Sequence, residues 1–302
     1  MSHETIAISG ASGALGSLLA ELAVREQPAE TVILTTRTPD ALADLAALGA
    51  QVRFADFDEP ESLTAAFAGA QRLALISASN VVGDRVTQHG AAIDAAAAAG
   101  VGHILFTSMP RVDEDDHPAG HAAREYRATE LLLPPAGPAW TVLRNGPYAE
   151  LNLVERIADS LVGGDLVTNT GDGGMAFVSR IDCAAAAYAV LTQDGHAGMT
   201  YDITGPASVS YGDVAALLTE VLGQPVGFRG IDDDEMAARF RAAAVPEEMV
   251  EPRVALGRAI RGGFFSAVSP TVEQLTGRPG LPVRSVLETH RDTLAAIVAA
   301  AA

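Results

Sequence analysis

The sequence contains no lysine. All 20 basic residues in a chain of 302 are arginines, and they face 38 acidic residues. Mechanisms that need an ammonium side chain are therefore excluded: a Schiff base, a pyridoxal anchor, the phosphate-binding lysine of a P-loop and a tyrosine–lysine couple. Any chemistry of this chain has to proceed without one.

Other shortages narrow the possible partners. A single cysteine, Cys183, allows no internal disulfide, and no Cys/His cluster has metal-ligand spacing, so no metal is expected. The net charge of −18 disfavours nucleic acid and anionic membranes. The chain shows neither a secretory signal pattern nor an apolar run near the roughly 20 residues of a membrane span. We expect a cytoplasmic monomer or homodimer with no nucleic-acid or membrane partner.

Apolar sequence, in contrast, is plentiful: 48% of the residues are hydrophobic, enough for a large core. In the first half, short β-branched runs alternate with Ala/Leu-rich stretches of helical length. Strands are expected at residues 5–9, 31–36, 51–55, 73–77, 103–107 and 139–143. Helices are expected at residues 15–25, 39–48, 61–67, 85–99 and 121–133. The predicted fold class is therefore α/β, a Rossmann doubly wound parallel sheet of six strands.

The pattern changes after Arg144. A helix is predicted at residues 179–192, a strand at 200–204, and another helix where Ser210 and Asp213 have capping-box spacing. Proline and glycine then interrupt the final third. We predict a sheet domain at residues 1–147 and a smaller, mainly helical substrate lobe at 148–302, with part of 165–205 returning to the sheet domain.

A glycine-rich turn joins the first predicted strand to the first predicted helix, as a dinucleotide-binding turn requires. Gly10 permits a tight turn, Gly13 lets the backbone approach a pyrophosphate, and Gly16 lets helix and strand pack closely. The N-terminus of the helix supplies N–H groups and partial positive charge. The cofactor contacts predicted here are Gly10, Ser12, Gly13, Ala14, Leu15 and Gly16. The alternative is a glycine-rich turn without a ligand.

The end of the second strand indicates which dinucleotide is bound. An acidic residue usually holds the ribose 2′-hydroxyl there, but this strand ends in Thr35, Thr36 and Arg37. A guanidinium beside hydroxyls suits a 2′-phosphate, so NADP(H) is favoured over NAD(H). The alternative for Arg37 is a solvated charge at a strand end.

Two later strand ends add candidate cofactor contacts. Asp56 is placed to accept from the adenine amine and Phe57 to pack beside it, although Asp56 could equally cap the following helix. The fourth strand is followed by polar residues placed to line the pyrophosphate and the nicotinamide ribose, namely Ser77, Ala78, Ser79 and Asn80.

These motifs resemble the short-chain dehydrogenase/reductase superfamily and, within it, the NmrA-like atypical group. The matching segments are residues 10–16, 35–37, 56–57, 104–108, 129–130, 141–148, 179–182 and 200–205. That group contains NADPH-dependent quinone reductases, triphenylmethane-dye reductases, aromatic-polyketide tailoring reductases and non-catalytic redox sensors. The resemblance implies an NADP-binding domain at residues 1–147, and it adds Thr107 and Asn145 to the expected cofactor contacts.

Conventional members of the superfamily use a serine, a tyrosine and a lysine. Ser108 matches the serine and Tyr126 the tyrosine, but Glu130 stands where the lysine is expected. Residues at i and i+4 share one helix face. A carboxylate there could accept a ribose hydrogen bond, which makes Glu130 an expected cofactor contact, but it would not stabilise a tyrosinate as a lysine does. Alcohol oxidation through a tyrosinate is therefore disfavoured.

Reduction of a conjugated acceptor asks less of the protein, because the arriving charge is delocalised onto oxygen and one hydrogen-bond donor suffices. The expected catalytic residues are Ser108 and Tyr126. The structural alternatives to catalysis are a strand-end hydrogen bond for Ser108 and amphipathic packing for Tyr126. For Glu130 the alternative to a cofactor contact is a solvated charge. His117 and His121 are further candidates, either as proton donors or as loop and cap residues.

The expected substrate contacts are Met109, Tyr148 and Phe228. Tyr148 follows the sixth strand, so it should point into the cleft or pack between the lobes. Several apolar residues of the last third would either wall a site for a flat aromatic molecule or form core, namely Met236, Phe240, Met249, Phe264 and Phe265.

The predicted function is an NADPH-dependent reductase that transfers hydride directly to a quinone or related polycyclic aromatic substrate, such as a polyketide, without flavin or metal. The alternative is a non-catalytic NADP(H)-sensing regulator, since the same fold supports binding alone. A nucleotide-sugar epimerase or dehydratase is disfavoured by the missing tyrosine–lysine couple.

Overall fold

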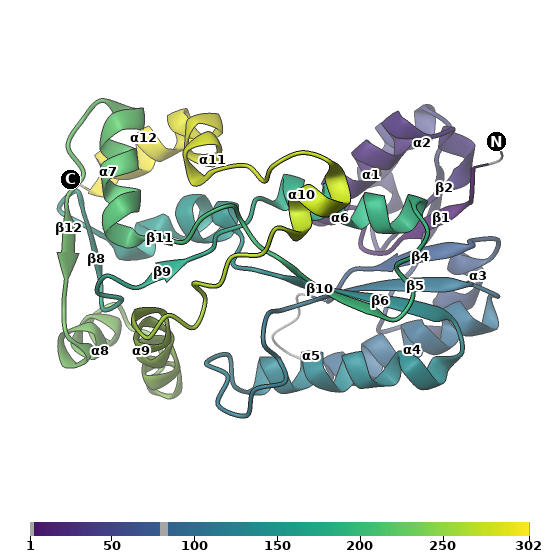
Figure 1. Cartoon of the computed structure of the whole chain (residues 1–302), viewed down its shortest axis with the longest axis horizontal. Coiled ribbons are helices and arrows are strands. Elements are labelled where there is room, and N and C mark those ends of the chain that lie inside the picture. Colours follow the sequence, from purple (N-terminus) through teal and green to yellow (C-terminus); the bar gives the residue numbers. More distant parts are fainter. Residues whose placement is uncertain (1–2, 79–83, 302) are drawn as a thin grey trace.

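The computed structural model describes residues 3–78 and 84–301 and is built around one seven-stranded sheet (Figure 1). Every neighbouring pair in this sheet is parallel. Its strands, in spatial order, are β3 (Gln51–Phe54), β2 (Val32–Thr36), β1 (Ile6–Ile8), β4 (Arg72–Leu75), β5 (His103–Ser108), β6 (Ala139–Asn145) and β10 (Met199–Ile203). The order reverses between β1 and β4, which confirms the Rossmann doubly wound fold and places its ligand-binding crevice at that point.

The sheet has one strand more than the six expected. β10 pairs in parallel with β6, from Met199 beside Thr141 to Ile203 beside Asn145. Its sequence was predicted as a strand within a segment of which part was expected to return to the sheet domain, but the local pattern did not predict its pairing with β6. Helix α6 (Arg180–Thr192) leads into it and packs on α1 (Gly16–Glu26).

Helices cover both faces of the sheet, as Figure 1 shows. On one face, α1 and α6 enclose a core that includes Leu19 and Ala184. On the other face, α3 (Leu63–Phe67), α4 (Arg85–Ala98) and α5 (His121–Leu132) enclose a second core around Phe67 and Phe106. A short helix, α2 (Ala43–Ala47), follows a 3-10 turn after β2. These helices lie close to their predicted positions, because their sequences have helical length and propensity.

The remaining residues form a smaller lobe at the other end of the molecule. Its helices are α7 (Tyr211–Leu222), α8 (Asp233–Ala242), α9 (Glu247–Arg261), α11 (Val283–Thr289) and α12 (Arg291–Ala301). Its strands are β7 (Leu161–Val162), β8 (Asp165–Thr168) and β12 (Phe228–Gly230) in one sheet, and β9 (Gly174–Met175) and β11 (Val209–Ser210) in another. The lobe has its own core, while α10 (Thr271–Thr276) returns to pack on α6.

Two helix starts follow the predicted capping chemistry. Ser179 accepts a hydrogen bond from the backbone of Ile181 at the start of α6. Ser210 and Asp213 form a capping box at the start of α7. Among the helices of the described residues, none combines the length and apolar character that a membrane crossing requires.

Candidate functional site

In the glycine-rich turn between β1 and α1, the residues at its two ends pack closely together. Gly10 has a φ of +61°, a conformation that glycine adopts without strain. A Cβ on Gly16 would lie 2.1 Å from the carbonyl oxygen of Gly10, and one on Gly13 would lie 3.2 Å from it. The backbone N–H of Ala11 donates to Thr35 at 3.0 Å and ties the turn to β2. The turn and packing roles predicted for Gly10 and Gly16 are thus present in the structure.

The tip of this turn lies beside the end of β2. The Ser12 hydroxyl is 2.6 Å from that of Thr36 and 3.5 Å from that of Thr38. Arg37, between the two threonines, is exposed. Three hydroxyls and a solvent-facing guanidinium form a donor set that fits a phosphate ester. Thr38 was not predicted, although its position next to Arg37 could have suggested it.

The other residues of the turn differ in how accessible they are to a ligand. Gly13 and Ala14 are exposed at the start of α1, and the backbone N–H of Gly13 donates to the carbonyl of Gly10 at 2.9 Å. The side chain of Leu15 is buried in the core beneath α1. A cofactor contact predicted at Leu15 is therefore restricted to its backbone. The small or absent side chains at the tip suit the close approach of a pyrophosphate.

The residues after β3 form a tight turn. The Asp56 carboxylate accepts the backbone N–H of Asp58 at 3.0 Å, whereas α3 begins only at Leu63. The alternative that Asp56 caps the following helix is therefore wrong. Phe57 packs on the core and meets His89 edge-on, with ring centroids 6.3 Å apart. Contact of Asp56 and Phe57 with adenine stays a prediction.

A chain of hydroxyls joins the ends of β4 and β5 to α5. Tyr126 donates to Ser77 at 3.0 Å, and the backbone N–H of Ser77 donates to Thr107 at 2.9 Å. The backbone N–H of Ala78 donates to a ring nitrogen of His89 at 2.9 Å. Two predicted contacts, Ser79 and Asn80, lie outside the described residues. Tyr126 thus does more than pack, because its hydroxyl supports the predicted cofactor-lining segment.

Glu130 occupies the position of the missing lysine, but it faces the protein. Ser108 donates to its carboxylate at 2.7 Å, and Arg144 donates to the two oxygens at 3.0 and 2.8 Å. Arg127 lies 3.4 Å from it. The side chain is only 5% exposed. Both expectations for Glu130, a ribose contact and a solvated charge, are corrected: β6 places Arg144 beside it, and the buried carboxylate is neutralised there.

The same contacts change the role of Ser108. Its hydroxyl proton goes to Glu130 in the interior, on the face of the sheet that α5 covers. β5 and β6 are in register here, with Ser108 beside Arg144. Ser108 therefore makes the strand-end hydrogen bond expected as the alternative to a catalytic role, and its hydroxyl proton is already donated to Glu130.

Asn145 and Tyr148 form a polar pair just beyond β6. Nδ2 of Asn145 donates to the Tyr148 hydroxyl at 3.0 Å, while the buried Oδ1 has no hydrogen-bond partner among the described residues. The Arg180 guanidinium lies 5.3 Å from the Tyr148 ring centre. Burial, which outweighs the other influences, raises the pKa of Tyr148, so its hydroxyl stays protonated.

The two candidate histidines have different surroundings. Nε2 of His117 lies 2.9 Å from the carbonyl of Pro110, and its Nδ1 accepts the backbone N–H of Ala119 at 3.0 Å. Burial lowers the pKa of His117, which favours the neutral ring these bonds require. His117 therefore holds its loop together. The side chain of His121 is 79% exposed at the start of α5 and lies 3.7 Å from Glu125.

Some apolar residues of the smaller lobe lie in its core, and others lie at its edge, facing the loop after β5. Phe228 packs in the core of that lobe against α7, so the expected substrate contact at Phe228 is corrected to a packing role. Phe264 instead reaches the loop after β5, where it meets His117 edge-on at 4.9 Å and lies 3.9 Å from the Arg111 guanidinium. Met109, at the start of this loop, is half-buried. Sequence alone could not separate these cases, because core and edge residues are equally apolar.

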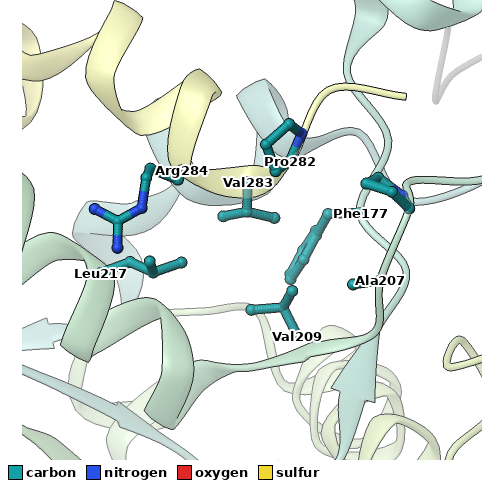
Figure 2. A pocket seen from close by; sticks show the side chains of 8 residues that line it. Phe177, Ala207, Val209, Leu217, Pro282, Val283 and Arg284 are labelled. Carbon is teal, nitrogen blue, oxygen red and sulfur yellow. The ribbon is translucent and has the colours of Figure 1, made fainter. Parts of the chain in front are cut away.

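A cavity of about 240 Å³ lies within the smaller lobe (Figure 2). Phe177, Val209, Leu217 and Val283 point into it from different elements, and Arg284 lies at its rim beside α7. None of the predicted site residues lines this cavity. It is therefore a feature of the lobe, distinct from the strand ends described above.

Arg85 and Glu125 form an ion pair next to Tyr126. Neither residue was singled out from the sequence. Arg85 donates to Glu125 at 2.6 Å, and its guanidinium lies 5.2 Å from the Tyr126 ring centre. Both side chains are nearly buried, at 9% and 12% exposure. Their pairing joins α4 to α5 and was not visible in either helix alone.

Comparison with known proteins places this geometry among dinucleotide-dependent enzymes. A family model described as NAD(P)H-binding matches residues 10–194, more than half of the chain. The chain is 36% identical to quinone oxidoreductase 2 of Escherichia coli over 275 residues, which are 91% of this chain and 94% of that protein.

Two solved structures extend the similarity to the whole fold. The E. coli NADPH-dependent quinone oxidoreductase complexed with NADPH superposes with a TM-score of 0.84 at 33% identity, covering 94% of this chain and 99% of that one. The triphenylmethane reductase of Citrobacter sp. complexed with NADP(H) gives a TM-score of 0.82 at 32% identity, with the same coverage. Both structures were determined with the dinucleotide expected from Arg37 and its neighbours.

Proposed function

The chain belongs to the NAD(P)H-binding family, in its NmrA-like group of atypical short-chain reductases, and from this membership we propose that it is an NADPH-dependent reductase of quinones or related polycyclic aromatic compounds. The observation that carries the proposal is the 36% identity to quinone oxidoreductase 2 along nearly the whole chain. NADP(H) is the cofactor, as in the solved relatives.

The residues present fit that cofactor. Gly13 and Ala14 are exposed at the turn before α1, where a pyrophosphate would be held. Ser12, Arg37 and Thr38 would hold the 2′-phosphate, because the hydroxyls of Ser12 and Thr38 lie close together and Arg37, which precedes Thr38, is exposed. Asp56 and Phe57 would hold the adenine.

The nicotinamide end would lie over β4 to β6. When bound, NADPH supplies a hydride from C4, so no flavin or metal is needed for the reaction we propose. Ser77 and Thr107 would line the ribose, supported from α5 by Tyr126. Met109 and the edge residue Phe264 are placed to exclude water from a flat aromatic acceptor.

We propose a cytoplasmic monomer or homodimer whose partner is a small aromatic molecule, because the net charge of −18 repels nucleic acid and anionic lipid. Sedimentation of the purified protein would test the assembly.

NADPH oxidation in the presence of acceptors tests the function. The purified chain, without added flavin, is mixed with NADPH or NADH and with 1,4-naphthoquinone, 1,4-benzoquinone or a triphenylmethane dye. We expect acceptor-dependent loss of NADPH absorbance and slower loss of NADH. Tight NADPH binding with no oxidation by any acceptor would contradict the proposal and favour a sensing role.

A further inference from the structure

Both hydroxyls that the sequence offers to an acceptor already donate inside the protein. Ser108 donates to Glu130 at 2.7 Å, and Tyr126 donates to Ser77 at 3.0 Å. A hydroxyl has one proton, so donation to a substrate oxygen would break the internal bond and leave a polar group unsatisfied. Neither residue is therefore ready to stabilise charge on an acceptor.

Tyr148 differs in the direction of its hydrogen bond. Its oxygen accepts from Nδ2 of Asn145 at 3.0 Å. Within residues 3–78 and 84–301, no group accepts the proton of the Tyr148 hydroxyl. The amide thus fixes the oxygen and leaves the O–H directed away from Asn145.

The position of this pair suits a reacting group. Asn145 ends β6, so the pair stands at the carboxyl edge of the sheet, between the ends of β5 and β10. The buried Oδ1 of Asn145 has no hydrogen-bond partner among the described residues. Buried polar atoms are nearly always paired, so this oxygen indicates that a bound ligand donates a hydrogen bond to it.

We propose that Tyr148 donates the hydrogen bond that stabilises the oxygen of the acceptor, with Asn145 as its positioning residue. This rests on the proposed function. As hydride adds to a ring carbon of a quinone, the electron pair of the conjugated carbonyl moves onto oxygen, and that oxygen takes the hydrogen bond from Tyr148. A proton from water then neutralises the oxygen, and tautomerisation gives the hydroquinone, so that hydride and proton together account for the two-electron reduction.

The surroundings of Tyr148 keep its hydroxyl protonated, so that it can donate a hydrogen bond. Burial raises its pKa, the buried Cys183 thiol and Tyr126 act in the same direction, and the hydrogen bond from Asn145 and the charge of Arg180 oppose them. The balance favours the neutral phenol, which donates a hydrogen bond without losing its proton.

Substitution of Tyr148→Phe tests the proposal directly. With 1,4-naphthoquinone we expect kcat to fall about 100-fold, the usual loss for one oxyanion donor, while the dissociation constant of NADPH stays within about twofold. Tyr201→Phe is the matched control: it removes a phenol hydroxyl that bonds His196, outside the residues assigned to the site, and should leave kcat unchanged. A larger loss in Tyr126→Phe than in Tyr148→Phe would overturn the proposal.

Asn145→Asp tests the positioning role at nearly constant volume. A carboxylate accepts the Tyr148 proton instead of donating to its oxygen, so kcat should fall at neutral pH and recover as the new carboxyl is protonated at lower pH. Recovery is expected because the protonated carboxyl donates as the amide does. An Asn145→Asp variant with the pH profile of the wild type would contradict the positioning role.

Infrared difference spectra provide a readout independent of turnover. With 1,4-naphthoquinone bound to NADP⁺-loaded protein, the hydrogen bond from Tyr148 should lower the carbonyl stretching frequency, and Tyr148→Phe should raise it again. An active wild type whose Tyr148→Phe variant keeps both kcat and the carbonyl frequency would overturn this inference alone. A wild type that binds NADPH but reduces no quinone would overturn the proposed function and this inference with it.

Discussion

The Ser108 hydroxyl donates a hydrogen bond of 2.7 Å to the Glu130 carboxylate. These are the two positions where a conventional relative would carry its catalytic serine and lysine. The contact lies in the interior, and Arg144 neutralises the carboxylate from β6. At these positions the chain has a buried hydrogen bond and, beside it, the ion pair between Glu130 and Arg144. The chemistry left to the chain is therefore one that needs no ammonium group.

Restoring the lysine should damage the protein. Glu130→Lys would place an ammonium against the Arg144 guanidinium, whose side chain is 13% exposed, and we expect the free energy of unfolding to fall by about 3–5 kcal/mol. Urea denaturation measures the loss. The double variant Glu130→Lys, Arg144→Glu restores opposite charges and should recover most of it, whereas a single variant as stable as the wild type would refute the buried pair.

Removal of the Arg37 guanidinium should alter cofactor choice without altering stability. Arg37 is exposed, so Arg37→Ala should leave the unfolding transition unchanged. Loss of a charge-assisted hydrogen bond to the 2′-phosphate should raise the dissociation constant of NADPH about tenfold and leave that of NADH unchanged. Fluorescence titration measures both, with Arg25→Ala, an exposed arginine of α1, as control. An equal weakening of both cofactors would contradict the assignment.

Two glycines should respond oppositely to alanine. A Cβ at Gly16 would lie 2.1 Å from backbone, so Gly16→Ala has to displace α1 from β1, and we expect a loss of about 1–3 kcal/mol together with weaker NADPH binding. At Gly90, within α4, the nearest atom would be Leu132 Cδ1 at 3.5 Å, an ordinary contact. Gly90→Ala should therefore stabilise the fold by about 0.5–1 kcal/mol. Thermal unfolding distinguishes the two directions, and a neutral Gly16→Ala would show that the turn adapts.

Most of the sheet domain was predictable, because its signals are local. Apolar runs and helical periodicity located the strands and helices, and the glycine spacing predicted a tight turn at Gly10 and close packing at Gly16. β10 was recognised as a strand, but its parallel pairing with β6 depends on the path of α6 across the sheet. Pairing between distant segments has no local signature.

The limits of prediction at the site have the same origin. Parallel strands end at one edge, so the ends of β4 and β5 bring Ser77 and Thr107 together, and Tyr126 reaches Ser77 from α5. Which hydroxyl keeps a free proton depends on partners from other elements, such as Arg144 for Glu130 and Asn145 for Tyr148. A motif indicates residue types at a place, but the hydrogen-bond directions come only from the assembled fold.

His89 should make the fold sensitive to mild acid. Burial, more than the nearby Arg85 charge, lowers the pKa of His89 to about 4, while the unfolded chain has a value near 6.5. Between these values the unfolded state binds the proton more readily than the folded state, so stability present above pH 6.5 is lost as the pH falls toward 4. One proton contributes a slope of up to about 1.4 kcal/mol per pH unit.

The contacts of His89 explain why the charged ring is disfavoured. One ring nitrogen accepts the backbone N–H of Ala78, and the other lies 3.0 Å from the Thr129 hydroxyl, so protonation would remove an acceptor in the interior. Urea unfolding as a function of pH should show a smaller slope in His89→Asn, by up to one proton. Ile93→Val, on the same helix, should lower stability by about 1 kcal/mol at every pH and keep the slope of the wild type. An unchanged slope in His89→Asn would mean that other groups set the acid sensitivity.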